Sequence, residues 1–575
     1  MRLVRLKINN YRSIGAIENG HAIDLEIDDN NLIFLCGSNN SGKSTIMAAY
    51  EMFVVANREA EEHDFHGRST NNQIEIEASI RAETEADRTH RALALLWDAD
   101  GIAKIRKTWR TVGDKGAKES FHPTDGWQEG GAGGFDTLLQ NVCPTPIWIR
   151  GSSTPEEILG LLRTLVQETI LRNIAGQQVY TDAIAAVRLL DTAIIQSEYA
   201  TSLQRNLNTA VASVFPRVSF AIRNDGTKDV TELFKTTATI EIREQERPNL
   251  GLSSHGHGVR RQFIMSAFRG LAMQLEEVKK AAKQRRTENY QIAEIVTQAG
   301  TPKSRMLLIE EPELFLHPAA IRSVRNLLYL LASSSEFQVM TATHSPVVID
   351  LARPHTTLAR VTASEAQGTR LYQVSSTLFS AEERETMKML NYFDPYVCEA
   401  FFASKVILVE GDTEAVVIRE LLSRLRDAAP NPALDELHVV NCGTKMNIPF
   451  FQKVLTHFHI PHSVFHDLDQ RLDRNGNGSA AWTLNERIWE NILTSRASGV
   501  GASRYVFNTE FESANGYALD ESVGKPFSAY REAAAWDLAD QTRAAIRFLG
   551  LVIAGAPHDP DFTQQELERL VPHEA

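Results

Sequence analysis

The pattern of apolar and polar positions divides the chain into strand-rich and helix-rich stretches. Alternation with a period of two predicts strands at residues 3–9, 73–80 and 103–110, and an apolar run predicts a further strand at 31–36. A glycine-rich turn after this run opens a predicted helix. Glycine and aspartate between 112 and 136 predict an exposed loop. The chain therefore opens on a β-rich segment with one early helix.

Helical spacing replaces this pattern from residue 154 onward. Thr154-Pro-Glu-Glu supplies an N-cap, a proline and first-turn acids, and leucines then recur at helical spacing. Strands return at 305–309 and 337–342, with a helix between them. Strands and helices alternate again over 406–466, as in a parallel sheet covered by helices. We therefore expect two halves of one domain (1–153 and 216–375), a helical insertion (154–215), a linker (376–400) and a second domain (401–575).

The composition is that of an ordinary globular protein, with 43% hydrophobic and 23% charged residues among 575. Apolar runs fall far short of the roughly 20 residues that span a bilayer, so no membrane contact is expected. Four widely spaced cysteines and no expected signal peptide indicate the cytoplasm. Acidic residues (73) outnumber basic ones (60), for a net charge of −13. A nucleic acid could approach only at a local basic patch or with divalent cations present.

One segment matches a phosphate-binding loop in full. Residues 37–44 read GSNNSGKS, which fits GxxxxGK[ST] between an apolar strand and a helix. Backbone N–H groups of such a loop surround phosphate oxygens, Lys43 meets the β/γ charge, and Ser44 can ligate Mg²⁺. The segment predicts an ATP site formed by Gly37, Asn39, Asn40, Ser41, Gly42, Lys43, Ser44 and Thr45.

Two later strands end in side chains that suit nucleotide hydrolysis. An apolar strand leads into Glu310 and Glu311, and the carboxyl edge of a sheet is where ligands bind in open α/β folds. Glu310 is expected to hold Mg²⁺ directly or through water, and Glu311 to polarise the attacking water. His344 ends another strand and is expected to sense the γ-phosphate.

These motifs, with Leu316-His317-Pro318, resemble ABC-type ATPases of the SMC/RecF branch. In that family a signature motif from a second subunit caps the nucleotide. The best match is LSSHGHGVRR at 252–261, which departs from the usual LSGGQ. The resemblance implies that Ser254, Gly256 and Gly258 contact the ATP of a partner subunit.

A second set of acids follows the strands of the C-terminal third. Glu410 and Glu414 bracket a turn in E-G-D-x-x-E, and Asp467 and Asp469 form D-x-D two strands later. All four carboxylates can reach one edge of a parallel sheet. Hard oxygen ligands without clustered Cys or His favour Mg²⁺ or Mn²⁺ over zinc.

This pair of motifs resembles the Toprim fold of topoisomerases, primases and certain nucleases. An ABC-type ATPase followed by Toprim resembles the OLD (overcoming lysogenisation defect) family of nucleases, which includes the Gabija nuclease subunit. The resemblance implies an α/β chain: an ABC/SMC-like head with a helical dimerisation insertion, then a Rossmann-like parallel-sheet domain. It implies further metal-ligating groups near Glu510 and Glu512, and a lysine, Lys525, near the scissile phosphate. Glu510 departs from the smaller polar residue or Asp expected there.

The implied mechanism is two-metal hydrolysis of a phosphodiester. We expect an ATP-regulated, Mg²⁺- or Mn²⁺-dependent DNA endonuclease in bacterial anti-phage defence, forming homodimers or larger homo-oligomers. A helicase-like or other defence protein is a candidate partner. Two alternatives remain open: an ATPase-gated Toprim RNase that cuts, for example, tRNA, and a non-catalytic DNA-repair scaffold related to SMC and RecF proteins.

Overall fold

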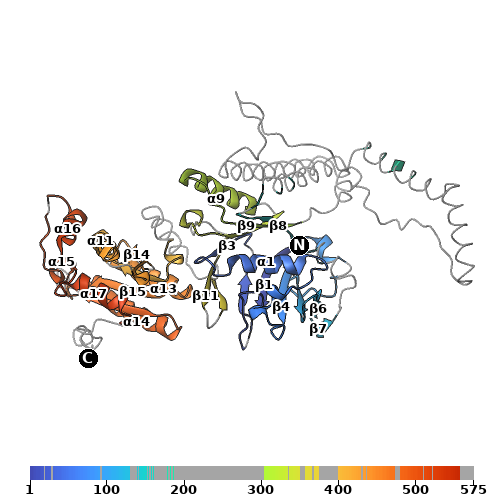
Figure 1. The fold of residues 1–575 in the computed structure, drawn as a ribbon, viewed down its shortest axis with the longest axis horizontal. Helices are drawn as coiled ribbons and strands as arrows, with labels where there is room; N and C mark the ends of the chain where they lie inside the picture. The colour runs from blue at the N-terminus through green and yellow to red at the C-terminus, as the bar shows by residue number, and fades with distance from the viewer. Residues whose placement is uncertain are drawn as a thin grey trace, which may run out of the picture. The chain divides into compact units, whose positions relative to one another are not determined.

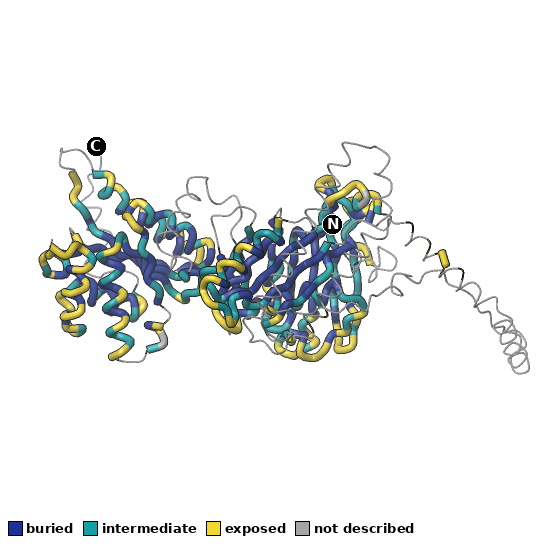
Figure 2. Tube along the Cα trace, turned by 90° about the horizontal axis from the view of Figure 1, so that it is seen from above, coloured by how far each residue is buried: buried dark blue, intermediate teal, exposed yellow. Residues whose placement is uncertain are grey.

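The computed structural model describes most of residues 1–160, 304–373 and 399–556. The longest stretches outside the described residues are 190–303, 374–398 and 557–575. The chain divides into two compact units, one of Met1–Gly151 with Lys303–Ala575 and one of Ser152–Pro302. The described strands of the first unit form three sheets, each with a buried interior and more exposed helices or loops around it (Figures 1 and 2).

The first sheet is antiparallel and comes from the N-terminal segment, in the order β2-β1-β4-β5-β6-β7. Its strands alternate between buried and less buried positions, because one face packs on the core. The predicted strands at 3–9, 73–80 and 103–110 are confirmed to within a residue or two. The bounds are β1 (Arg2–Asn9), β2 (Ile23–Glu26), β4 (Ile74–Arg81), β5 (Ile102–Trp109), β6 (Ala117–His122) and β7 (Gly126–Glu129).

The exposed loop predicted between 112 and 136 is wrong in part, because this stretch contains the β6–β7 hairpin. Phe121 and Trp127 are paired across it, with ring centroids 5.5 Å apart in an edge-on arrangement. The guanidinium of Arg106 on β5 lies 4.3 Å from the Trp127 ring centroid. Cross-strand aromatic pairs stabilise such edges where the apolar alternation is weak.

The second sheet has the order β12-β11-β3-β10-β9-β8, parallel except for the edge strand β12. Every residue of β3 and β10 is buried, as expected for parallel strands covered on both faces. Helix α1 (Lys43–Val54) contacts strands of both this sheet and the antiparallel one. The strands are β3 (Leu32–Cys36), β8 (Thr145–Ile149), β9 (Arg305–Glu310), β10 (Phe337–Ala342), β11 (Thr356–Ser364) and β12 (Gly368–Gln373), and α9 (Pro318–Ser333) connects β9 to β10.

The third sheet is fully parallel, with the order β14-β13-β15-β16. One face packs on α11, α16 and α17, and α13 and α14 pack together against its strands. The strands are β13 (Lys405–Val409), β14 (Leu437–Asn441), β15 (His462–Asp467) and β16 (Ala502–Phe507). The helices are α11 (Asp412–Ala428), α13 (Ile448–His457), α14 (Ala480–Ala497), α15 (Phe511–Ala514), α16 (Lys525–Ala535) and α17 (Ala544–Ile553).

The predicted α/β class is confirmed. In the third sheet, β14 lies on one side of β13 and β15 on the other, so the chain reverses its direction of winding at β13. Ligands of open α/β sheets bind at the carboxyl edge next to such a reversal. None of the described helices is long and apolar enough to cross a membrane.

Candidate functional site

The phosphate-binding loop depends on two glycines. Gly37 has a φ of 145°, and a Cβ there would lie 2.1 Å from the carbonyl oxygen of Val361. Gly42, the N-cap of α1, has a φ of 100°, and its Cβ would lie 2.5 Å from Oγ1 of Thr369. Side chains are strained at such φ values, and neither position has room for one. The path of the loop around the helix N-terminus is therefore set, and helix N-termini bind phosphate.

Lys43 is a buried cation in the first turn of α1. Its Nζ donates hydrogen bonds to the carbonyl oxygens of Gly37 (3.1 Å) and Ser38 (2.7 Å). Burial lowers the pKa of Lys43 to about 8, although nearby acidic groups, including Glu311, act to raise it. The predicted ligand Ser41 is also buried. The other residues predicted to contact the nucleotide are partly or fully exposed on the loop and the first turn of α1: Asn39, Asn40, Ser44 and Thr45.

The ends of β9 and β10 bring the hydrolysis residues toward this loop. Glu310 ends β9, and Glu311 follows it with a left-handed φ of 44°. His344 follows β10, which lies between β3 and β9. Burial and then the charge of Lys43 lower the pKa of His344, while Glu311 raises it. The backbone N–H of Glu311 donates a hydrogen bond of 2.7 Å to the carbonyl oxygen of Ala342, so Glu311 and His344 follow neighbouring strand ends.

Glu313 organises this arrangement, a role that sequence reasoning missed. Its Oε1 accepts hydrogen bonds from Oγ1 of Thr343 (2.9 Å) and from the backbone N–H of His344 (2.7 Å). The carboxylate therefore ties the loop after β9 to the loop after β10. The sequence shows Glu313 only as the last acid of E-E-P-E, and its partners are found 30 residues later.

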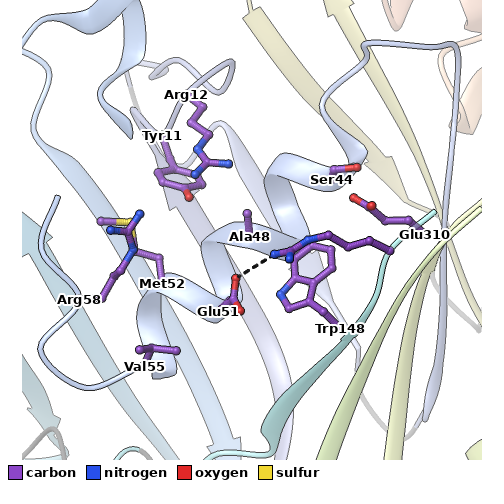
Figure 3. Close-up of a pocket in the computed structure, with 11 residues that line it drawn as sticks. Tyr11, Arg12, Ser44, Ala48, Glu51, Met52, Val55, Arg58, Trp148 and Glu310 are labelled. Atoms are coloured by element: carbon purple, nitrogen blue, oxygen red, sulfur yellow. Dashed lines mark ion pairs between the residues drawn. The ribbon is translucent and has the colours of Figure 1, made fainter. Parts of the chain in front are cut away.

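A cavity of about 330 Å³ adjoins the nucleotide loop along α1 (Figure 3). Ser44 and Glu310 line it beside aromatic and cationic side chains. Arg150 lies 3.9 Å from a carboxylate oxygen of Glu51 and 4.7 Å from the ring centroid of Trp148. The other lining residues belong to none of the sequence motifs: Tyr11, Arg12, Ala48, Met52, Val55 and Arg58.

Acidic side chains converge at the carboxyl edge of the third sheet. Glu410 follows β13, and its Oε1 accepts a hydrogen bond of 2.8 Å from the backbone N–H of Asp467, the last residue of β15. Glu414, on the first turn of α11, accepts one from the N–H of Gly411 at 3.0 Å. The parallel pairing of β13 with β15 brings Glu410 and Asp467 together, although they are 57 positions apart in the sequence.

The charges of this acidic cluster (Glu410, Glu414, Asp467 and Asp469) are balanced only in part by the cations of the described residues. Burial and the neighbouring carboxylates raise the pKa of Asp467 to about 9. Burial raises the pKa of Glu410 to about 7, and the pKa of Glu414 also rises. Oδ1 of Asp467 is buried and has no hydrogen-bond partner among the described residues. A buried acceptor without a donor is destabilising unless a further cation or proton satisfies it.

Lys445 is a buried cation inside the acidic cluster, and sequence reasoning missed it. Its side chain is 5% exposed, and Nζ lies 2.5 Å from Oδ2 of Asp469 and 3.9 Å from Oε1 of Glu410. It also donates a hydrogen bond to the carbonyl oxygen of Asp467. Lys445 follows β14 in a short 3-10 turn, and only the strand order brings it to these acids.

Further side chains border the acidic cluster from the segment after β16. Nζ of Lys525, at the start of α16, lies 3.9 Å from Oε1 of Glu512. Glu512 acts to raise the pKa of Glu414, and Lys525 to lower it, so both lie near α11. The hydroxyl of Tyr517, also missed, is buried without a hydrogen-bond partner in the described part of the chain. Glu510 is the exposed N-cap residue of α15.

The donor chemistry of the acidic cluster fits a hard divalent cation. Its donors are carboxylate oxygens, and the buried Oδ1 of Asp467, which has no hydrogen-bond partner among the described residues, could bind such an ion. Within the described residues, however, no three His, Cys, Asp or Glu side chains already surround a common point. Between Glu410 and Asp469, the Lys445 ammonium is the group that balances the carboxylates.

Two family models match the chain. The model described as Overcoming lysogenization defect protein-like, TOPRIM domain, matches residues 401–469, which include the acidic cluster. The model described as AAA ATPase domain matches residues 1–96 and 169–349, which include the phosphate-binding loop and the two hydrolysis strands.

Two curated nucleases are similar to parts of this chain. Over 440 residues the chain is 26% identical to Old nuclease of Escherichia phage P2. This alignment covers 69% of this chain and 67% of the phage protein. Over 201 residues the chain is 31% identical to OLD nuclease of Thermus scotoductus, and this alignment covers 35% of each protein.

The chain joins an AAA ATPase domain to an OLD-like TOPRIM domain, a combination consistent with an ATPase–Toprim protein of the OLD family. One similar solved structure is a SmcHead bound to the C-winged helix domain of ScpA, which is 13% identical in sequence and has a TM-score of 0.37. The match covers 65% of this chain and 98% of that chain. Another is the C-terminal region of the Burkholderia pseudomallei OLD protein, which is 19% identical and has a TM-score of 0.20. The match covers 26% of this chain and 99% of that chain.

The protein is an enzyme with an ATPase domain and a Toprim nuclease domain. These domains imply the use of a nucleotide and a divalent metal ion, and a nuclease implies a nucleic-acid substrate. The predicted signature residues Ser254, Gly256 and Gly258 lie outside the described residues, as does the predicted insertion (154–215) from residue 190 onward. The individual roles of the site residues remain predictions.

Proposed function

We propose that this OLD-family protein binds and hydrolyses ATP and is a divalent-metal-dependent DNA endonuclease in bacterial anti-phage defence. The observation that carries this proposal is the acidic cluster at the reversal of the Toprim sheet. Three of its carboxyl groups have raised pKa values because they are buried together. Such a cluster costs folding free energy, and divalent cations bound there would remove that cost.

Four residues would hold the ions: Glu410, Glu414, Asp467 and Glu512. Bound Mg²⁺ or Mn²⁺ would supply an activated water and would neutralise charge on the phosphodiester. Lys525 is exposed at the mouth of this site, where its ammonium can meet a phosphate oxygen. Lys445 is bonded to Asp469, so it orients that carboxylate instead of leaving it free for a metal.

The ATPase domain would bind its nucleotide on the loop from Gly37 to Thr45. Among the described residues, Lys43 Nζ donates hydrogen bonds to oxygen atoms of its own loop, and phosphate oxygens could replace these acceptors. Ser44 and Glu310 face one cavity, from which both could hold Mg²⁺. Glu311 would then orient the attacking water, and His344 would contact the γ-phosphate. A homodimer would bring the signature residues of one copy to the ATP of the other.

A cleavage assay tests the nuclease proposal. Plasmid DNA and tRNA are incubated with the purified chain in Mg²⁺, Mn²⁺ or EDTA, with and without ATP. We expect metal-dependent cutting of DNA, and a loss of at least about a hundredfold in Asp467→Asn and Glu410→Gln. Glu486→Gln, an exposed acid on α14, is the matched control.

Each other outcome selects an alternative. Cutting of tRNA alone would favour an RNase. Metal-dependent cutting that survives both substitutions would refute the assignment of the acidic cluster. A chain that binds ATP and DNA but cuts neither nucleic acid would favour the scaffold.

A further inference from the structure

We propose that the Toprim site binds one divalent ion, and that the ammonium of Lys445 takes the position of the second ion of a two-metal site. The proposal rests on the nuclease function proposed above and specifies how many ions that function uses. Two-metal sites place their ions about 3.5–4 Å apart among shared oxygen ligands. In this chain a cation of the protein itself lies among the carboxylates.

Lys445 contacts three of the residues that the sequence predicts as metal ligands. Its Nζ lies 2.5 Å from Oδ2 of Asp469 and 3.9 Å from Oε1 of Glu410, and it donates a hydrogen bond to the carbonyl oxygen of Asp467. An ammonium has three donors and no acceptor, so oxygen atoms on several sides satisfy it as they satisfy a hard metal ion. The surroundings of Nζ are therefore those of a cation held by oxygen ligands.

The position of Lys445 is fixed from the interior of the domain. Its side chain is 5% exposed, and it belongs to the 3-10 turn Lys445–Asn447 that precedes α13. The side chain of Asn447 donates a hydrogen bond of 2.8 Å to the carbonyl oxygen of Cys442, a buried residue. The lysine stem therefore enters the acidic cluster from an anchored base. Leaving the cluster would cost Lys445 its ion pairs, which a buried cation needs.

The backbone of Asp469 departs from the strand that carries Asp467. Strand β15 ends at Asp467, and Asp469 has a left-handed φ of 63°. The alternation of a strand therefore does not extend to Asp469, and its Oδ2 accepts a hydrogen bond from Nζ of Lys445. We assign Asp469 to the ammonium and not to a metal ion, although the D-x-D motif predicts it as a ligand.

Oδ1 of Asp467 marks the position of the single ion. It is buried and has no hydrogen-bond partner in the described part of the chain. Glu512, another proposed ligand, has an ion pair of 3.9 Å with Lys525, whose side chain is 70% exposed. An exposed ion pair of this kind is weak, so Lys525 does not compete with a divalent ion for the Glu512 carboxylate.

A second ion would have to share its oxygen atoms with the ammonium. Glu410 and Asp469 are both within 4 Å of Nζ. Two cations about 4 Å apart repel each other strongly in a buried site, because little water screens them. The second position therefore stays closed to a metal ion as long as Lys445 is present.

Electron paramagnetic resonance of bound Mn²⁺ tests this stoichiometry in the full chain without nucleotide. Two Mn²⁺ ions within about 4 Å of each other are magnetically coupled, whereas an isolated ion elsewhere in the chain adds only an uncoupled signal. The wild type should show no coupled pair at saturating Mn²⁺. Lys445→Met should bind one ion more than the wild type and should show the coupled pair, because methionine leaves Glu410 and Asp469 without their cation.

Lys525→Met is the matched control, because it removes the same charge from an exposed side chain beside the same cluster. It should bind as many ions as the wild type and show no coupled pair. An additional ion in Lys525→Met would mean that net charge, and not the position of Lys445, limits metal binding, and this would overturn the proposal.

The outcomes also separate this proposal from the nuclease function. If the wild type cuts DNA and shows a coupled Mn²⁺ pair, the nuclease stands and the role of Lys445 is wrong. The wild-type spectrum decides this by itself, whether or not Lys445→Met folds. A folded Lys445→Met that binds no additional ion would contradict the proposal as well. If the wild type neither binds Mn²⁺ nor cuts any nucleic acid, the nuclease function itself fails.

Discussion

Replacing Lys445 with methionine should lower the local stability of the Toprim site, and a bound divalent metal ion should recover most of that stability. The ammonium is buried and lies within 4 Å of carboxylate oxygens of Glu410 and Asp469. Removing one partner of a fully buried ion pair costs about 3–5 kcal/mol. Asp469 is 31% exposed, so part of this cost is screened, and we expect about 3 kcal/mol at pH 8.

Hydrogen–deuterium exchange of peptides from β13 and β15 measures this loss. It is preferable to one global melting temperature because the chain folds into several sheets. A loss of about 3 kcal/mol corresponds to exchange about 150 times faster in EDTA. Metal at about one hundred times its dissociation constant should return about 2.7 kcal/mol.

Met446→Ala is the matched control, because this neighbouring side chain is exposed. It should exchange like the wild type in EDTA and in metal. Equal exchange of Lys445→Met and the wild type in EDTA would refute the argument that Lys445 holds the acids together. A loss in Lys445→Met that metal does not reduce would refute the argument that the ammonium and the metal neutralise the same charges.

Three other predictions concern separate parts of the molecule. Gly37→Ala should abolish binding of a fluorescent ATP analogue, because its Cβ would lie 2.1 Å from the Val361 carbonyl oxygen, whereas Gly550→Ala, at an open position of α17, should bind normally. Glu311→Gln should retain ATP without turnover in a phosphate-release assay, and normal hydrolysis would contradict its assignment. His462 is buried, and burial lowers its pKa to about 4, so the folded state binds its proton less readily than the unfolded state. Its contribution to stability is therefore present above pH 6.5 and is lost on acidification toward pH 4, by about 2 kcal/mol between pH 7 and pH 5. Urea unfolding of the Toprim domain in His462→Gln should show a correspondingly smaller pH dependence, and an unchanged one would be inconsistent with a buried neutral histidine.

The nucleotide loop could be predicted from the sequence because its chemistry is local. Gly37, Gly42 and Lys43 lie within one strand–turn–helix, and their spacing alone determines the geometry. The acids after the strands could be predicted for a related reason. Parallel strands end at one edge, so the sequence predicts that Glu410 and Asp467 meet, and β13 and β15 are paired in parallel.

Residues whose partners come from other strands could not be predicted in this way. Lys445 follows an ordinary strand, and its role depends on β14 lying next to β13, a neighbour relation that no spacing encodes. Glu313 meets the His344 loop only because β10 pairs with β9. The β6–β7 hairpin was mistaken for a loop because its pairing depends on two aromatic residues and not on a run of apolar ones.

The sequence by itself determined which chemistry the chain carries: a phosphate loop, and acids placed at strand ends. The tertiary structure decided which charges balance one another, because burial and strand order determine which groups lie within a few ångströms. Electrostatic interactions in a buried site depend steeply on such distances. The raised pKa values of the acidic cluster and the cation inside it are therefore properties of the fold, and they became visible only once the strands were in place.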